Sequence, residues 1–310
     1  MINCGPAPIF ALPRMFKIAP GASPADAALL LYLGAVLCFG ALDALAKWLS
    51  RDLAVLEVVW GRYLFGLLVV LPFVPLRQFP TLLRSAKPLT QVARAVFLAI
   101  ATLLFFAAVS RMQLAEVVAI GFLAPLAVVA LSALIFGERV GPRRWTAVAF
   151  GFVAVLAILR PGFGVVTAAA LAALGVPFCN AAYHLATRQL SSVDPTATTL
   201  VWTGAIGTAM FSLGVPFVWS WPTAVEWLAM LAMGGFAALG HGLLIVAYRH
   251  VTPSSLAPYM YLSLPWVTLL GFVLFGDLPD LWAVLGAAGL IASGIYVYYR
   301  ERHLRRLGRL

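Results

Sequence analysis

One long apolar stretch occurs twice in this chain. The segments AEVVAIGFLAPLAVVALSALIFGE (115–138) and SSLAPYMYLSLPWVTLLGFVLFGD (254–277) each carry one interior proline and end in Phe-Gly followed by an acid. Proline and acid are 13 positions apart in the first copy and 12 in the second, so the match contains a one-residue slip. Residues 33–50 also resemble 174–192, which aligns Cys38 with Cys179 and Lys47 with Arg188. A repeat that covers about half of the chain predicts an architecture of two similar halves.

The composition indicates a membrane protein. The 310 residues are 63% hydrophobic and 10% charged, with a mean hydropathy of +0.99. A soluble domain has roughly a quarter of its residues charged, whereas a helix that crosses a bilayer needs about 20 apolar residues. The net charge of +10 does not indicate a nucleic-acid partner, because the basic residues stand singly or in small groups between apolar runs, as they do in membrane loops.

Charged residues and helix breakers divide the chain into ten predicted transmembrane helices. Residues 1–26 are rich in proline and are predicted to form a disordered cytoplasmic tail, and residues 300–310 form a basic cytoplasmic tail. The first repeat covers 27–162 and the second covers 163–299. The predicted spans are 27–49, 56–76, 90–110, 113–136, 143–160, 167–189, 197–219, 224–248, 253–275 and 279–299.

The distribution of basic residues predicts the orientation. With the N-terminus inside, fifteen Lys and Arg fall in inner segments and three, Arg51, Arg111 and Arg160, fall in outer loops. This asymmetry places both termini in the cytoplasm. Because each half has five helices, the second half enters the membrane from the opposite side. The expected fold is therefore all-α, with two five-helix inverted-topology repeats around a central cavity, an arrangement common in secondary transporters.

The sequence lacks the motifs of several other classes. The three cysteines and four histidines do not show metal-ligand spacing, and no nucleophile elbow or phosphate-binding loop is present. We therefore expect no metal, no cofactor, no enzymatic activity and no ATPase subunit.

Four charged residues are predicted to gather near the outer mouth of the cavity. Asp43 and Lys47 are four apart and share a helical face, and Glu57 and Arg62 enter from the same side. Charges inside spans are expensive, which makes each a functional candidate. They could form an outer gate, or a clamp on the carboxylate and amine of a zwitterionic substrate. The alternative is a structural ion-pair network that closes the first helical hairpin, with Lys47 reaching toward the interface.

Other candidates are histidines, aromatic residues and prolines. His184 and His241 could couple transport to protons, or could satisfy hydrogen bonds between helices. Several aromatic side chains could line the cavity. Pro125 and Pro265 could form hinges, or only packing kinks, and Arg94 is expected to anchor at the inner interface. The aromatic candidates are Trp60, Tyr183, Trp202, Tyr259, Tyr261 and Trp266.

Residues 27–299 resemble the drug/metabolite transporter superfamily, in the ten-helix branch built from two EamA domains. The resemblance lies in DALAKWLS (43–50), EVVWGRYLF (57–65), FLAPL (122–126), FGERVGPRRW (136–145), LRPG (159–162), YHLATRQL (183–190) and FGDLPDLW (275–282). It implies a basket of helices around a central cavity, without an ATP-hydrolysing domain. Members of the family export amino acids and opine-type metal-chelating metabolites, or import riboflavin or S-adenosylmethionine.

The expected function is secondary transport of a small organic metabolite across the inner membrane by alternating access, with export preferred. A coupling proton or an exchanged solute is a further possible partner, beside the substrate and the lipid bilayer. Import of riboflavin or S-adenosylmethionine is the first alternative. An intramembrane enzyme or a sensor ranks lower, because neither paired catalytic groups nor a soluble output domain is evident.

Overall fold

The computed structural model describes residues 24–73, 82–124, 126–127, 142–159, 167–190, 193–250 and 256–306. All regular elements in these ranges are helical. Predictions on residues 1–23, on Pro125, on the segment 128–141 and on the last four residues lie outside the described part. The helices are α2 (Pro24–Leu49), α3 (Val55–Val70), α5 (Pro88–Val109), α6 (Leu114–Gly121), α8 (Pro142–Leu159), α9 (Ala168–Leu190), α10 (Thr196–Ser212), α11 (Ala224–His250), α13 (Ser263–Phe275) and α14 (Leu281–Arg306), with short 3₁₀ turns at Leu71–Phe73, Val215–Phe217 and Ala257–Leu262.

Many of these helices match the requirements of a bilayer. Within the described ranges, six helical segments are long and apolar enough to cross a membrane, and two further apolar helices are shorter. The prediction of an all-α membrane protein is confirmed, while the count of ten spans stays a prediction. The six segments are Asp26–Leu49, Pro88–Val109, Ala168–Thr187, Ala197–Phe217, Ala224–Leu244 and Leu281–Arg300, and the shorter two are Trp145–Leu159 and Tyr259–Phe275.

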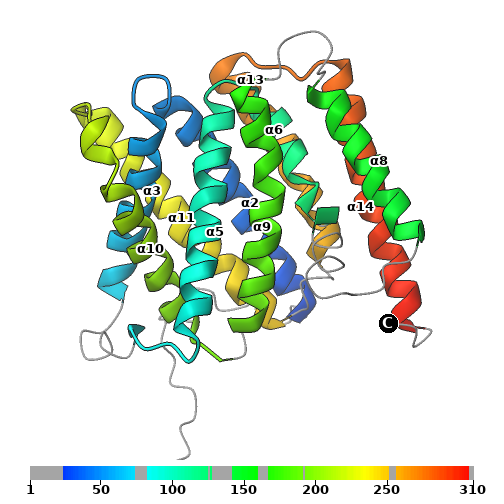
Figure 1. The fold of residues 1–310 in the computed structure, drawn as a ribbon, viewed down its shortest axis with the longest axis horizontal. Coiled ribbons are helices and arrows are strands. Elements are labelled where there is room, and N and C mark those ends of the chain that lie inside the picture. Colours follow the sequence, from blue (N-terminus) through cyan, green and yellow to red (C-terminus); the bar gives the residue numbers. More distant parts are fainter. Residues whose placement is uncertain are drawn as a thin grey trace, which may run out of the picture.

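The helices run side by side along one direction, so the bundle has two ends (Figure 1). At the end that we call the Lys47 end, α2, α5, α10 and α13 finish and α3, α6, α11 and α14 begin. The opposite end contains the turn between α9 and α10, and we call it the Asp194 end.

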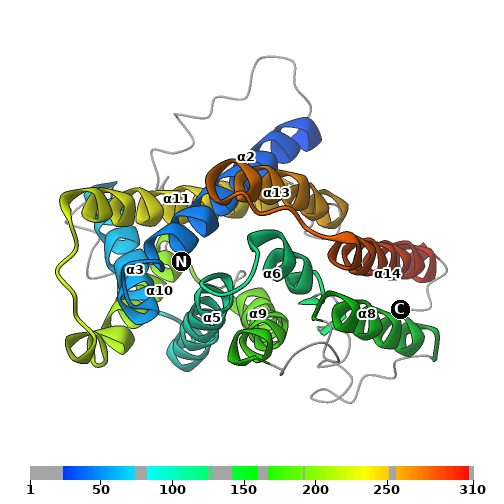
Figure 2. The same cartoon turned by 90° about the horizontal axis from the view of Figure 1, so that it is seen from above.

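The packing of the helices is reciprocal between the two parts of the chain. Helix α2 packs against α11, and α9 packs against α5. Helix α3 packs on α10, α6 on α13 and α8 on α14. In chain order, α2 corresponds to α9, α3 to α10, α5 to α11, α6 to α13 and α8 to α14. Under this exchange the pair α2–α11 becomes the pair α9–α5, and each of the other three pairs becomes itself. Seen from above, α8 and α14 form a pair at one side of the bundle (Figure 2).

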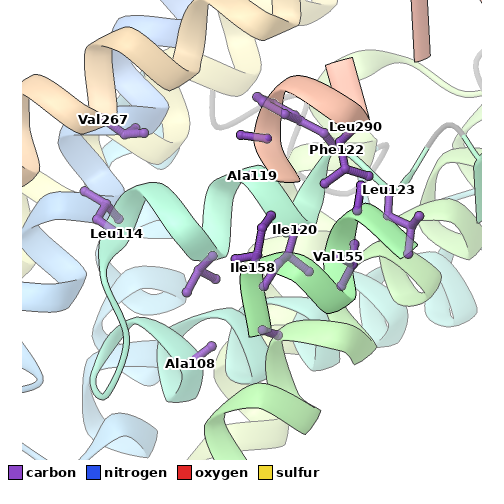
Figure 3. Packing of buried hydrophobic residues seen from close by; sticks show 14 of the residues in the cluster. Ala108, Leu114, Ala119, Ile120, Phe122, Leu123, Val155, Ile158, Val267 and Leu290 are labelled. Carbon is purple, nitrogen blue, oxygen red and sulfur yellow. The ribbon is translucent and has the colours of Figure 1, made fainter. Parts of the chain in front are cut away.

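The largest hydrophobic cluster joins this outer pair to the rest. Ile120 on α6 and Leu123 in the turn after it lie among Val155 and Ile158 of α8 and Leu290 of α14, and all five are at least 96% buried (Figure 3). Close contact between α8 and α14 depends on Gly286, where an added Cβ would lie 2.6 Å from the carbonyl oxygen of Ala154. Complementary apolar packing of this kind holds helices together where lipid supplies no hydrophobic driving force.

Some helix ends differ from the sequence-based prediction. The sequence predicts the ninth span at 253–275 with Pro265 in its interior, but α13 begins at Ser263 after a 3₁₀ turn. Pro265 therefore lies in the first turn, where its missing N–H removes no helical bond. The boundary between the third and fourth spans is a short turn: α5 ends at Val109 and α6 begins at Leu114, where the backbone N–H of Gln113 donates to the Glu116 carboxylate at 3.4 Å.

Candidate functional site

A cavity of about 300 Å³ lies between helices from both parts of the chain. Its walls come from α2, α3 and α5 of the first part of the chain and from α9 and α11 of the second part. Most of the lining is aromatic or aliphatic, and the polar lining residues are Asp43, Arg62, Thr102, Asn180, Tyr183 and His241. A smaller cavity of about 50 Å³, between α3, α5, α10 and α11, shares Arg62, Leu98 and His241 with it. A mainly apolar cavity with a few convergent polar groups is the usual form of a small-molecule site.

Arg62 lines this cavity and is held through its Nη1. Its side chain is 92% buried, and its Nη1 donates to the Thr102 hydroxyl at 2.8 Å. That hydroxyl donates to the Leu98 carbonyl at 2.8 Å, and the Tyr63 hydroxyl lies 3.0 Å from it. The Arg62 Nε is buried and has no hydrogen-bond partner among the described residues. Leaving a buried donor unsatisfied costs about 1–3 kcal/mol, so a ligand that places a hydrogen-bond acceptor beside this nitrogen would be stabilised.

Asp43 is the one carboxylate in the lining of this cavity as the structure describes it. It lies on α2 and lines the same cavity as Arg62. Of the four charges predicted to form one cluster, the structure thus brings Asp43 and Arg62 to a common cavity.

Lys47 and Glu57 lie elsewhere. The Lys47 ammonium pairs with the Asp277 carboxylate and donates to the Met112 carbonyl at 2.9 Å, so it joins α2, the turn before α6 and the end of α13. Glu57 is fully buried and accepts bonds from the hydroxyl and the backbone N–H of Ser220, at 2.9 and 3.3 Å. The expected single cluster is therefore divided among three places, because the fold supplies partners from the second part of the chain.

Arg94 is buried, and its predicted place at the interface is wrong. Its side chain is 3% exposed, and its three nitrogens donate to the hydroxyls of Thr187, Thr203 and Tyr183 at 2.9, 2.7 and 3.2 Å. Its guanidinium also lies 4.8 Å from the centre of the Tyr183 ring. All of these partners are neutral. The sequence signal for a buried position is that Arg94 stands inside an apolar run. Counting charges alone treats such a residue as the end of a span.

His241 lines both cavities from α11. Its ring packs edge-on against Phe39 of α2, with centroids 5.0 Å apart. Gly240 makes this approach possible, because a Cβ there would lie 2.9 Å from the Phe39 ring. Tyr183 lines the larger cavity from α9, six residues after Pro177, which lies inside that helix and which the sequence pattern does not single out. The side chain of His184 falls outside the described part.

The remaining aromatic candidates do not line these two cavities. Trp60 donates to the Ser212 hydroxyl at 2.9 Å, and Trp266 donates to the Leu37 carbonyl at 3.1 Å. Tyr261 packs edge-on against Phe122 with centroids 5.0 Å apart. Trp202 is half-buried on α10, whereas Tyr259 and Pro265 are exposed. Among the described residues, no group of three His, Cys, Asp or Glu side chains is placed to hold a metal ion.

Residues 26–160 match the model of the EamA-like transporter family. The chain is 27% identical over 274 residues to a riboflavin transporter of Rhizobium johnstonii, covering 87% of this chain and 90% of that protein. It is 24% identical to an S-adenosylmethionine uptake transporter of Rickettsia prowazekii, with 84% and 88% covered, and 26% identical to a pseudopaline exporter of Pseudomonas aeruginosa, with 83% and 90% covered.

One solved crystal structure has the same fold. It superposes with a TM-score of 0.63 at 22% identity, over 90% of this chain and 99% of the other. The family match in the first half, the full-length relatives and the apolar helices agree with one another. The chain is a multi-pass membrane protein that is similar over most of its length to transporters of the drug/metabolite transporter superfamily, and residues 26–160 match the EamA-like transporter family.

Proposed function

We propose that this protein is a secondary transporter that moves a small organic metabolite through the cavity that Asp43 and Arg62 line. The observation that carries the proposal is the position of this cavity. It lies between helices from both parts of the chain and contains charged side chains where apolar ones would be less costly. A volume of about 300 Å³ lies at the lower end of the range for small-molecule sites.

The proposed mechanism is alternating access by two inverted repeats, 27–162 and 163–299. The reciprocal packing of the helices supports this division, because exchanging the two halves maps the packing pairs onto one another. In this scheme the Lys47 end faces outward and both termini are cytoplasmic, as the basic residues predict. Rocking of one half against the other would then open the cavity to each side in turn.

Export of an amino-acid-like or opine-type metabolite is our first choice for the direction, and the similarity to the pseudopaline exporter supports it. Uptake of riboflavin or a cofactor such as S-adenosylmethionine is the second candidate, and the similarity to the riboflavin and S-adenosylmethionine transporters favours it. The direction depends on the gradients and on any coupled proton or exchanged solute, so it has to be measured in cells.

The test compares metabolites inside and outside cells that lack the gene, contain it or overexpress it. For an exporter, one compound accumulates inside the deletion strain and appears in the medium on overexpression. For an importer, a compound remains in the medium of the deletion strain and is drawn down on overexpression. If no compound changes its distribution, and purified protein in vesicles moves no solute but converts a membrane substrate, the transporter proposal is wrong and an intramembrane enzyme takes its place.

A further inference from the structure

We propose that the transported compound is an organic anion and that its carboxylate binds the unused edge of the Arg62 guanidinium. This inference rests on the proposed transport function and assigns the substrate class. Three observations carry it: the charges around the cavity, the free edge of Arg62, and the neutral surroundings of Arg94.

The charges around the cavity do not balance. Among the described residues, the charged side chains that line the cavity or bond to its lining are Asp43, Arg62 and Arg94. One carboxylate therefore faces two guanidinium groups. The Lys47–Asp277 pair is neutral as a unit and lies at the end of the bundle. Since a buried charge without a counter-charge is costly, a cavity with a positive surplus favours a ligand that is negatively charged.

Arg62 has the geometry to receive such a ligand. The Thr102 hydroxyl accepts a hydrogen bond from Nη1, while Nε has no hydrogen-bond partner among the described residues. A carboxylate can accept two parallel N–H bonds from one edge of a guanidinium, and such bidentate pairs are among the strong hydrogen bonds in proteins. The contacts of Thr102 with Leu98 and Tyr63 hold the other side of the group fixed, so little ordering is left for the ligand to induce.

Arg94 acts through Tyr183 as a positioning residue. Its bonds to Thr187 and Thr203 anchor the guanidinium between α9 and α10, and its bond to the Tyr183 hydroxyl fixes a ring that lines the cavity. Because no described carboxylate pairs with Arg94, its charge adds to the positive potential on the α9 side of the cavity.

A zwitterionic substrate would use the same cavity differently. Its amine would bind Asp43, so loss of Asp43 or of Arg62 would weaken binding alike. An anion instead is repelled by Asp43 and attracted by Arg62. The two models therefore predict opposite effects of Asp43→Asn on the KM of transport.

The first part of the experiment determines the charge of the substrate together with its identity. Cells that lack the gene are complemented with the wild type, with Arg62→Gln or with Arg111→Gln, a control in an exposed turn outside the cavity. The compounds whose distribution depends on the wild-type gene are then identified by mass spectrometry, and their net charge at pH 7 is assigned. We expect a net negative compound whose transport survives Arg111→Gln and is lost in Arg62→Gln. A neutral or cationic compound overturns the inference and leaves the transport function standing, whereas the absence of any such compound overturns both.

The second part measures KM and kcat for that compound in vesicles with purified protein. Removing a charge-assisted bidentate contact should raise KM in Arg62→Gln by on the order of 10- to 100-fold, and Arg62→Lys should recover only part of this. Asp43→Asn should lower KM or leave it unchanged. An equal rise of KM in Asp43→Asn and Arg62→Gln would contradict the anion assignment. The charge of the wild-type substrate remains decisive if a variant does not fold.

Discussion

The ion pair between Lys47 and Asp277 offers the sharpest test of the fold, because it joins residues 230 positions apart. In Lys47→Met the side chain keeps its unbranched shape, is one atom shorter and loses its charge. Asp277 is then left without its partner and the Met112 carbonyl without its donor at 2.9 Å. Lys47 also lies 5.0 Å from the centre of the Phe275 ring, so the change removes one of the contacts that hold the end of α13 to α2.

The expected cost follows from the burial of the pair. Exposed ion pairs contribute about 0.2–1 kcal/mol, and removing one partner of a fully buried pair costs about 3–5 kcal/mol. The two side chains are 12% and 26% exposed, so solvent screens them in part and we expect about 2 kcal/mol for Lys47→Met. Asp277→Asn keeps an acceptor for Lys47 and should cost about 1 kcal/mol. In the double variant no unpaired carboxylate remains, so its cost should be about 1.5 kcal/mol below the sum of the single costs.

The assay is a double-mutant cycle on the free energy of unfolding of the purified protein in micelles, followed by circular dichroism. The reference cycle combines Lys47→Met with Asp43→Asn, the pair that sequence spacing alone suggests. There the coupling should stay below about 0.5 kcal/mol. Additive costs for Lys47 and Asp277, or a larger coupling between Lys47 and Asp43, would refute the placement of the pair.

Three further predictions concern packing, pH and topology. Gly234→Ala should destabilise the protein by about 1–3 kcal/mol, because the added Cβ would lie 2.5 Å from the backbone nitrogen of Gly66. Gly235→Ala, where an added Cβ would have nothing within 4 Å, should leave the stability nearly unchanged. The melting temperatures of the two variants test this difference. Burial raises the pKa of Asp194, but hydrogen bonds from Ser85, the Ala86 N–H and Gln91 outweigh it and hold the pKa below its ordinary value. The stability from this ionised group is therefore fully present above the unfolded-state pKa of about 3.9 and is lost as the pH falls through the lower folded-state pKa. The difference in the free energy of unfolding between wild type and Asp194→Asn should shrink over that pH window. A constant difference would contradict the assignment. A reporter that is active only outside the cytoplasm should be active when it is fused after Asp52, Gln113 or Gly162. It should be inactive after Arg84, Arg143 or Arg305, and activity at Arg305 would contradict the inverted-repeat topology.

The positions of several helices could be predicted from the sequence because apolar runs and breakers determine them locally. The chain from Pro88 to Val109, for example, forms one helix close to the predicted span of 90–110. The local signal is weaker where a proline stands inside an apolar run. The pattern around Pro265 predicts a mid-helix break, and the structure instead begins α13 two residues before it.

The partners of the charged residues could not be predicted in the same way. Spacing on one helix relates Lys47 to Asp43, but only the packing of α13 against α2 brings Asp277 to Lys47. Arg94 illustrates the same limit: the hydroxyls that surround it come from α9 and α10, which follow it much later in the chain. Long-range pairing of this kind depends on the tertiary arrangement, which periodicity does not encode.

The most direct test of the central claim asks whether the cavity lined by Asp43 and Arg62 is the transport route. Ala101 lines it and is 97% buried, so Ala101→Cys, in a protein whose native cysteines are replaced by alanine, places one small thiol there. A charged, membrane-impermeant thiol reagent is added to the outer or the inner side of sealed vesicles, and labelling is measured with and without the transported compound. Alternating access predicts labelling from both sides and protection by the compound. A thiol that is labelled from neither side, or from one side alone under all conditions, would contradict the account.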